Sequence, residues 1–123
     1  MKGRPRVLTF THWICPGMIR ELVHYGIHFL LPVLIGVVAF PAQRLRASAI
    51  LLSGILIDLD HLLANPMFDP MRCSIGFHPL HTYPAIAVYA ALLLFRKSRI
   101  AGLALLIHIL ADITDCWLLR FEI

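Results

Sequence analysis

IDLDHLLANP, residues 57–66, ends an apolar segment with two aspartates and a histidine, directly before an Asn-Pro pair that stops a helix. Ionisable side chains in such a segment are tolerated when they face the interior of a helical bundle rather than lipid. Asp58, Asp60 and His61 therefore predict that polar groups from other segments approach this end of the helix.

Seven further ionisable residues interrupt or flank three other apolar segments. The chain is predicted to be all-α, a four-helix up-down-up-down bundle with helices over residues 19–40, 45–64, 82–95 and 100–119. Two short basic turns, PAQRLR (41–46) and RKSR (96–99), and a longer loop between helices two and three (67–81) connect them. This topology brings ten side chains to one end of the bundle: His24, His28, Asp58, Asp60, His61, His78, His81, His108, Asp112 and Asp115.

Composition indicates an integral membrane protein with one domain. Apolar residues make up 59% of the 123 residues and charged residues only 15%, and the mean hydropathy is +0.80. A soluble domain of this size would need more polar surface. The net charge of +4 is carried at segment ends, which suits anionic headgroups, and no basic stripe with interleaved aromatic residues predicts a nucleic-acid partner.

The lengths of the segments depend on their ionisable residues. Fully apolar stretches are shorter than the ~20 residues that cross a bilayer core, so most segments reach that length only with the ionisable groups included. The third segment is short even then. Pro32 is expected to kink the first helix, and Gly54, one turn before Asp58, would permit close helix approach.

The N-terminal residues 1–17 are predicted to form a basic, aromatic interfacial arm ahead of the four-helix domain, residues 18–123. Phe10 and Trp13 suit the headgroup zone, and the stretch lacks the apolar core and cleavage site of a signal peptide. Met18, where the organised part begins, is an alternative start.

The three cysteines, Cys15, Cys73 and Cys116, form no CxxC pair. An odd, scattered set indicates buried or free thiols rather than a disulfide framework. Cys73 lies five residues before His78, which leaves a ligand role open.

Helical spacing groups the polar residues into stripes. At ~100° per residue, His24 and His28 share one stripe, and the group from His108 to Asp115 lies within roughly 60°. Asp58 and His61 share a face. Asp60 points away from Asp58 on a regular α-helix, so that both can serve one centre only near a frayed end.

Buried carboxylates need a neutralising partner. An unpaired Asp at the bilayer centre costs ~2.5–3.5 kcal/mol, so four would cost on the order of 10 kcal/mol, reduced by their position near one interface. Arg and Lys are too few nearby, and a divalent metal held by imidazole and carboxylate is the natural neutraliser. Two ions bridged by an aspartate could clamp a phosphoryl group and activate water, and Arg72 could hold a substrate phosphate.

The order IDLDH (57–61), the loop histidines and HILAD (108–112) resembles the small bacterial membrane-bound metal-dependent hydrolases, which are distantly similar to zinc-dependent phospholipase C. The closer resemblance is to a compact four-helix branch with the pattern D-L-D-H-L-L-A-x-P-x-F-D-P-x-R-C-S-I-G-F-H-P-L-H, present here at 58–81, and it covers roughly residues 18–119. It implies multi-pass placement in the bacterial inner membrane. It also implies metal ligands at His28, Asp58, Asp60, His61, His78, His81, His108 and Asp112, with His24 and Asp115 as additional candidates.

The function predicted from these observations is hydrolysis of a phosphoester or similar bond in a membrane lipid, with one or two divalent ions, zinc first and manganese or iron as alternatives. Asp58, Asp60 and Asp112 are the expected catalytic carboxylates. A non-enzymatic divalent-metal-binding or transport protein is the alternative, followed by a structural subunit or haem anchor. If translation starts at Met18, five basic residues in the short turns against three elsewhere favour cytoplasmic turns and an outward-facing site.

Overall fold

The first helix is a rod of 22 residues made of three consecutive pieces. In the computed structural model, which describes residues 17–121, these are α1 (Met18–Tyr25), the π-helical turn η2 (Gly26–Leu30) and α2 (Leu31–Ala39). Pro32 has no N–H, and its ring would collide with the carbonyl of His28 four residues earlier. The irregularity expected at Pro32 is therefore present as a widened turn that contains His28.

The second segment changes its helical type halfway along. A short 3₁₀ turn, η3 (Pro41–Gln43), leads into α3 (Arg44–Leu52), and the chain continues as a 3₁₀ helix, η4 (Ser53–Leu63). Burial follows the three-residue period of that helix, because Gly54, Ile57 and Asp60 are buried. The intervening stripe of Leu56, Leu59 and Leu62 is exposed.

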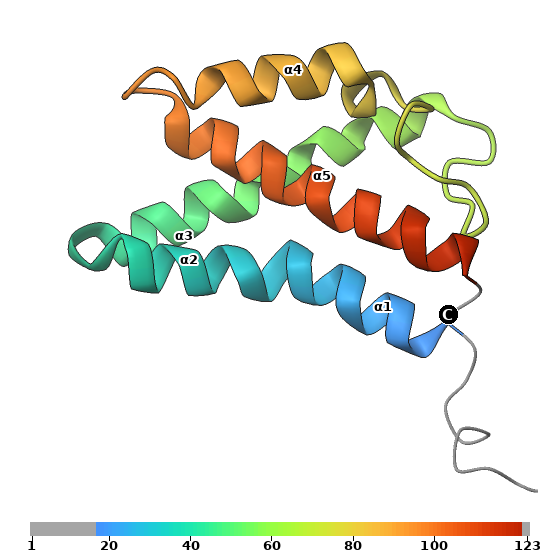
Figure 1. Cartoon of the computed structure of the whole chain (residues 1–123), viewed down its shortest axis with the longest axis horizontal. Helices are drawn as coiled ribbons and strands as arrows, with labels where there is room; N and C mark the ends of the chain where they lie inside the picture. Colours follow the sequence, from blue (N-terminus) through green and yellow to red (C-terminus); the bar gives the residue numbers. More distant parts are fainter. Residues whose placement is uncertain (1–16, 122–123) are drawn as a thin grey trace, which may run out of the picture.

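The last two helices form a hairpin of unequal lengths. After the loop, the 3₁₀ turn η5 (Pro79–His81) leads into α4 (Tyr83–Leu92), and α5 (Arg99–Arg120) returns. α5 is the central helix, since it packs against α1, α2, α3, η4 and α4 (Figure 1). The predicted four-helix up-down order is confirmed for residues 17–121, but α4 is only 10 residues long and ends earlier than expected.

Close backbone packing aligns η4 with α5. A Cβ atom on Gly54 would lie 2.8 Å from the carbonyl carbon of Ala104, so only glycine fits there. The close approach predicted at this glycine is thus confirmed. Leu51, Ala104 and Ile107 form a buried apolar cluster beside it, between the two ends of the bundle.

A disulfide joins the long loop to the last helix. Cys73 and Cys116 are bonded, with their Cα atoms 5.0 Å apart and a sequence separation of 43. The prediction of free thiols was therefore wrong for these two residues. The pairing depends on the loop folding back onto α5, which the spacing of cysteines along the chain does not reveal.

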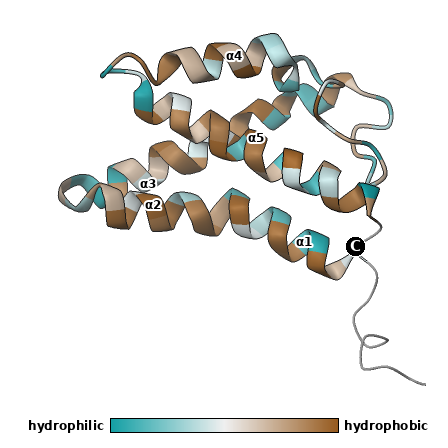
Figure 2. Cartoon of the chain, viewed as in Figure 1, coloured by the Kyte–Doolittle hydropathy of each residue, from teal (hydrophilic) through white to brown (hydrophobic). Residues whose placement is uncertain are grey.

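Many large apolar side chains are exposed, and Figure 2 shows hydrophobic residues along each of the helices. Two helices, Met18–Ala39 and Arg99–Arg120, are long and apolar enough to cross a membrane, and Tyr83–Leu92 is a shorter apolar helix. The predicted N-terminal arm, apart from Gly17, lies outside the described residues.

Candidate metal centre

The polar parts of four segments meet at the end of the bundle that contains the long loop. α1 with η2, the end of η4, the loop with η5 and the second half of α5 lie toward one end of the bundle (Figure 1). All ten ionisable residues singled out above are in these segments. The convergence predicted from the topology is confirmed.

Four side chains from three segments surround one point. Asp58, His81, His108 and Asp112 each offer one ligand atom, and these atoms lie within 4.8 Å of one another. His81 Nε2 is 2.9 Å from Asp112 Oδ2 and 3.4 Å from Asp58 Oδ1. His108 Nε2 is 3.3 and 3.1 Å from the same two oxygens, and 3.3 Å from His81 Nε2.

These spacings fit a shared cation. Bonds of about 2.0–2.1 Å to nitrogen and oxygen place the corners of a tetrahedral site about 3.3 Å apart, as geometry requires. The five separations span 2.9–3.4 Å. Asp112 Oδ2 is buried and lies between the two imidazoles, 2.9 Å from His81 Nε2 and 3.3 Å from His108 Nε2. The four residues could therefore hold a metal ion.

Asp112 also belongs to a second group. Its Oδ1 lies 3.6 Å from His28 Nε2, and His24 completes this group. The rings of His24 and His28 are 4.4 Å apart, as their predicted common stripe requires. Because Asp112 presents one oxygen to each group, its carboxylate could bridge two ions.

Asp60 lies behind His81 rather than in the tetrad. Its Oδ2 accepts the Leu80 N–H at 2.8 Å and lies 2.9 Å from His81 Nδ1. A carboxylate on the far nitrogen of a ligating histidine fixes its tautomer and the orientation of its ring. Asp60 could therefore position His81, whereas the sequence predicted that Asp60 and Asp58 would serve one centre only near a frayed helix end.

Asp60 has a second set of neighbours. Its Oδ1 lies 3.1 Å from His61 Nδ1, and the rings of His61 and His78 stack at 3.8 Å. These three residues form a third group that could hold an ion. Both loop histidines expected as ligands therefore belong to groups that could hold an ion: His81 to the tetrad and His78 to the third group.

Asp115 forms an ion pair with Arg20. Arg20 donates from Nε to Asp115 Oδ1 at 2.6 Å and from Nη2 to Oδ2 at 3.2 Å, and Nη2 also donates to the Pro70 carbonyl at 2.6 Å. Asp115 is in none of the three groups. This ion pair ties α1, α5 and the loop together.

Electrostatics differ between the two loop histidines. Burial lowers the pKa of His78, and the adjacent His61 lowers it further. Burial also disfavours the charged form of His81, but hydrogen bonds to three carboxylates, Asp112 foremost, outweigh it and raise the pKa of His81 to about 10. In the metal-free protein the tetrad therefore holds a proton where a cation would sit.

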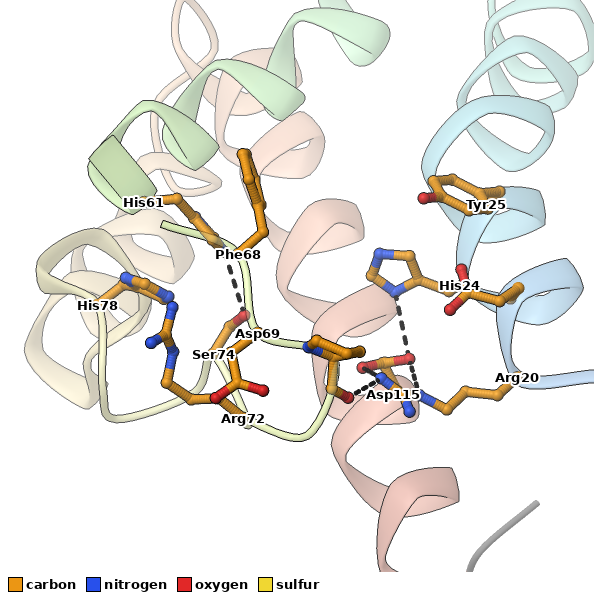
Figure 3. A pocket seen from close by; sticks show the side chains of 12 residues that line it. Arg20, His24, Tyr25, His61, Phe68, Asp69, Arg72, Ser74, His78 and Asp115 are labelled. Carbon is orange, nitrogen blue, oxygen red and sulfur yellow. Dashed lines mark hydrogen bonds and ion pairs between the residues drawn. The ribbon is translucent and has the colours of Figure 1, made fainter. Parts of the chain in front are cut away.

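A cavity of about 290 Å³ leads from Asp58 and Asp112 to the surface. An overlapping cavity of about 230 Å³ lies beside it and is drawn in Figure 3, with His24, Tyr25 and Arg20 of α1 on one side and His61, Phe68 and Arg72 on the other. Arg72 donates to the carbonyls of Pro66 and Met67 at 2.8 and 3.2 Å and lies over the Phe77 ring. It therefore borders the cavity, as a phosphate-binding residue would have to.

Two residues near the site were missed by the sequence analysis. Arg20 is four residues before His24 on the same helical stripe, which could have indicated it. Ser74, whose Oγ is 3.4 Å from His61 Nε2, gives no comparable signal, because the loop that positions it has no regular period.

The comparisons with known proteins concern the helical region as a whole. No curated protein and no solved structure matches the chain. Residues 18–119, which include every candidate ligand, match the family described as "Family of unknown function (DUF6122)", and the chain belongs to that family.

Proposed function

We propose that this protein is a membrane-embedded, metal-dependent hydrolase that acts on a phosphoester bond of a membrane lipid. The observation that supports this most is the tetrad of Asp58, His81, His108 and Asp112, whose donor atoms lie at the spacing of a tetrahedral site.

Membrane placement is supported by helix lengths. Met18–Ala39 and Arg99–Arg120 have 22 residues each, or about 33 Å against a hydrocarbon core of about 30 Å. The segment from Arg44 to Leu63 reaches about 35 Å, because a 3₁₀ helix rises about 2.0 Å per residue. Its exposed leucine stripe would face lipid. α4 is too short to cross the hydrocarbon core. The loop that precedes it would therefore lie close to the membrane.

The donor set favours zinc, with manganese or iron as alternatives. Two imidazoles and two carboxylates in a tetrahedral arrangement are typical zinc ligands. For catalysis, His81, His108 and Asp112 would hold the ion and the more exposed Asp58 would leave it, because a catalytic ion needs an open position. At that position the ion would supply activation of water near neutral pH and polarisation of a phosphoryl oxygen.

The protein's own groups suit the accompanying steps. The side chain of Asp58 is 33% exposed, against 6% for Asp112. Asp58 is therefore the carboxylate that can accept a proton from water in the cavity. Asp60 keeps the His81 ring oriented.

The cavity suits an amphiphilic substrate with a phosphate. Arg72 supplies a guanidinium on its rim, and guanidinium groups bind phosphate oxygens in pairs. Tyr25, Phe29 and Phe68 line the same cavity with apolar surface, and all three are exposed. A headgroup could approach the tetrad while its chains remain against these side chains.

The disulfide and the basic turns support one orientation. Disulfides persist in oxidising compartments, and Cys73–Cys116 lies at the end that carries the metal ligands. Basic turns are retained in the cytoplasm. Both observations favour a site that opens on the outer side of the inner membrane.

Transport is less well supported than hydrolysis. A transported ion needs a polar route to the opposite face. Leu51, Ala104 and Ile107 are packed together on that side of the tetrad, with apolar neighbours around them.

The test uses the full chain purified in neutral detergent without chelator. Elemental analysis should find zinc or a similar ion, and incubation with bacterial lipid extract should release phosphorus-containing products detectable by mass spectrometry. The double variant Asp58→Ala, His108→Ala should lose both. Glu21→Gln, which removes a carboxylate from the outer cavity but from none of the three groups, is the matched control. Equal turnover by the double variant would refute hydrolysis at this site.

A further inference from the structure

The end of the bundle opposite the metal ligands contains a separate cavity. It has a volume of about 470 Å³ and is lined by residues of the two short turns, which lie at the left of Figure 1. Arg46 contributes from the first hairpin, and Arg96 and Arg99 contribute from the second. Phe40, Ile50 and Ile100 supply apolar walls.

Charge is segregated between the two ends. The five basic residues of this end are Arg44, Arg46, Arg96, Lys97 and Arg99. The acidic residues within 17–121 are all at the other end: Glu21, Asp58, Asp60, Asp69, Asp112 and Asp115. Within this range none of the five basic side chains forms an ion pair, whereas Arg20 does. The cavity therefore presents unneutralised guanidinium groups.

An apolar groove continues from the arginines along the helices. A neighbouring cavity of about 250 Å³ shares Phe40, Arg99 and Ile100 with the first and extends to Leu93 and Leu103. Ile100 and Leu103 are one turn apart on α5, so the groove runs along the helix axis. A ligand that fills both cavities has an anionic head and an apolar tail.

We propose that this pocket binds an anionic phospholipid, with its phosphate between Arg46, Arg96 and Arg99 and an acyl chain against Phe40, Leu93 and Leu103. Guanidinium groups bind phosphate bidentately, and basic pockets between membrane helices are known lipid-headgroup sites. The inference rests on the membrane placement proposed above but not on the metal centre or its chemistry.

A bound lipid would link the two hairpins. Arg46 follows the first turn and Arg99 begins α5, so one phosphate contacts both halves of the bundle. Lipid binding should therefore raise the melting temperature of the protein, which makes stability a direct readout.

The experiment titrates phosphatidylglycerol into the full chain in dodecyl maltoside, with phosphatidylcholine of the same acyl chains and inorganic phosphate as separate arms. Binding is measured by native mass spectrometry and by the shift in melting temperature. The pocket variant is Arg46→Gln, Arg99→Gln. The control is Arg44→Gln, Lys97→Gln, which removes two charges at the same end outside this cavity.

We expect phosphatidylglycerol to bind the wild type and the control at least tenfold more tightly than the pocket variant, and more tightly than phosphatidylcholine. Equal weakening in both variants would overturn the proposal in favour of diffuse charge attraction. Inorganic phosphate that binds or stabilises as well as the lipid would overturn the acyl-chain contact. Metal content and lipid hydrolysis, measured on the same samples, separate these outcomes from failure of the proposed hydrolase, because the pocket variant keeps every metal ligand.

Discussion

Replacing Asp60 by asparagine tests whether Asp60 positions the ligand His81 or binds the metal ion itself. Asp60 Oδ2 accepts the Leu80 N–H at 2.8 Å and lies 2.9 Å from His81 Nδ1. An asparagine carbonyl in the place of Oδ2 can still accept from both groups. The substitution therefore removes the negative charge behind His81 and leaves the ring in position.

The expected loss follows from that geometry. Changes behind a ligating histidine typically weaken metal binding 10–100-fold, and Asp60→Asn should fall near tenfold, or about 1.4 kcal/mol. Asp60→Ala should approach or exceed 100-fold, since it leaves the Leu80 N–H and the His81 ring without their acceptor. Asp112→Asn should have the largest effect, because it changes a donor atom of the tetrad.

Zinc affinity is measured by competition with a chromogenic chelator for the wild type and the three variants. Glu21→Gln again serves as the control and should match the wild type. The decisive result is the order of the losses in zinc affinity: smallest for Asp60→Asn, larger for Asp60→Ala and largest for Asp112→Asn. If Asp60→Asn abolished binding as completely as Asp112→Asn, Asp60 would be a direct ligand and the positioning role would be refuted.

Three further predictions test the packing, the disulfide and the protonation of the site. Gly54→Ala should destabilise the fold by roughly 1–3 kcal/mol, measured by thermal unfolding, because the new Cβ meets the Ala104 backbone. It should also weaken zinc binding. Unchanged zinc affinity would show that the close contact does not align the ligands. Replacing Cys73 and Cys116 by serine should cost roughly 2–4 kcal/mol, and reducing agent should lower the wild-type melting temperature but not that of the variant. Since the pKa of His81 is raised to about 10, this imidazole is protonated at neutral pH in the metal-free protein. Zinc has to displace that proton, so zinc affinity should rise by at least about tenfold per pH unit below pH 10; affinity independent of pH would contradict this.

Helix number, order and the convergence of the polar ends could be predicted because each depends on local patterns. Apolar segments, two short basic turns and one long loop fix an up-down topology, and that topology alone brings Asp58, His81 and Asp112 to one end. The rotation of the second segment could not be predicted at 100° per residue, because η4 is a 3₁₀ helix. At 120° per residue Asp58 and His61 eclipse each other, while Asp60 faces η5.

The burial pattern of this segment follows the 3₁₀ period. From residue 51 onward the buried positions recur every third residue, and the exposed Leu56, Leu59 and Leu62 repeat with the same spacing. Hydropathy does not reveal this period, because the buried positions 51, 54, 57 and 60 are Leu, Gly, Ile and Asp. The disulfide and the Arg20–Asp115 ion pair could not be predicted either, because both depend on contacts between residues far apart in the chain.

Charge balance sets the number of ions that the resting site can hold. Of the four aspartates singled out in the sequence as candidate ligands, Asp115 is paired with Arg20, and Asp60 accepts hydrogen bonds from the backbone and a histidine. Asp58 and Asp112 remain, and one divalent ion neutralises both. A second ion at His24 and His28 would share Asp112 and carry an excess positive charge in an apolar setting, unless a phosphate anion came with it. We therefore expect one ion per chain in the purified protein and a second when a phosphate analogue is added, measured by elemental analysis after gel filtration with and without the analogue. Two ions without added anion would contradict this assignment of charges.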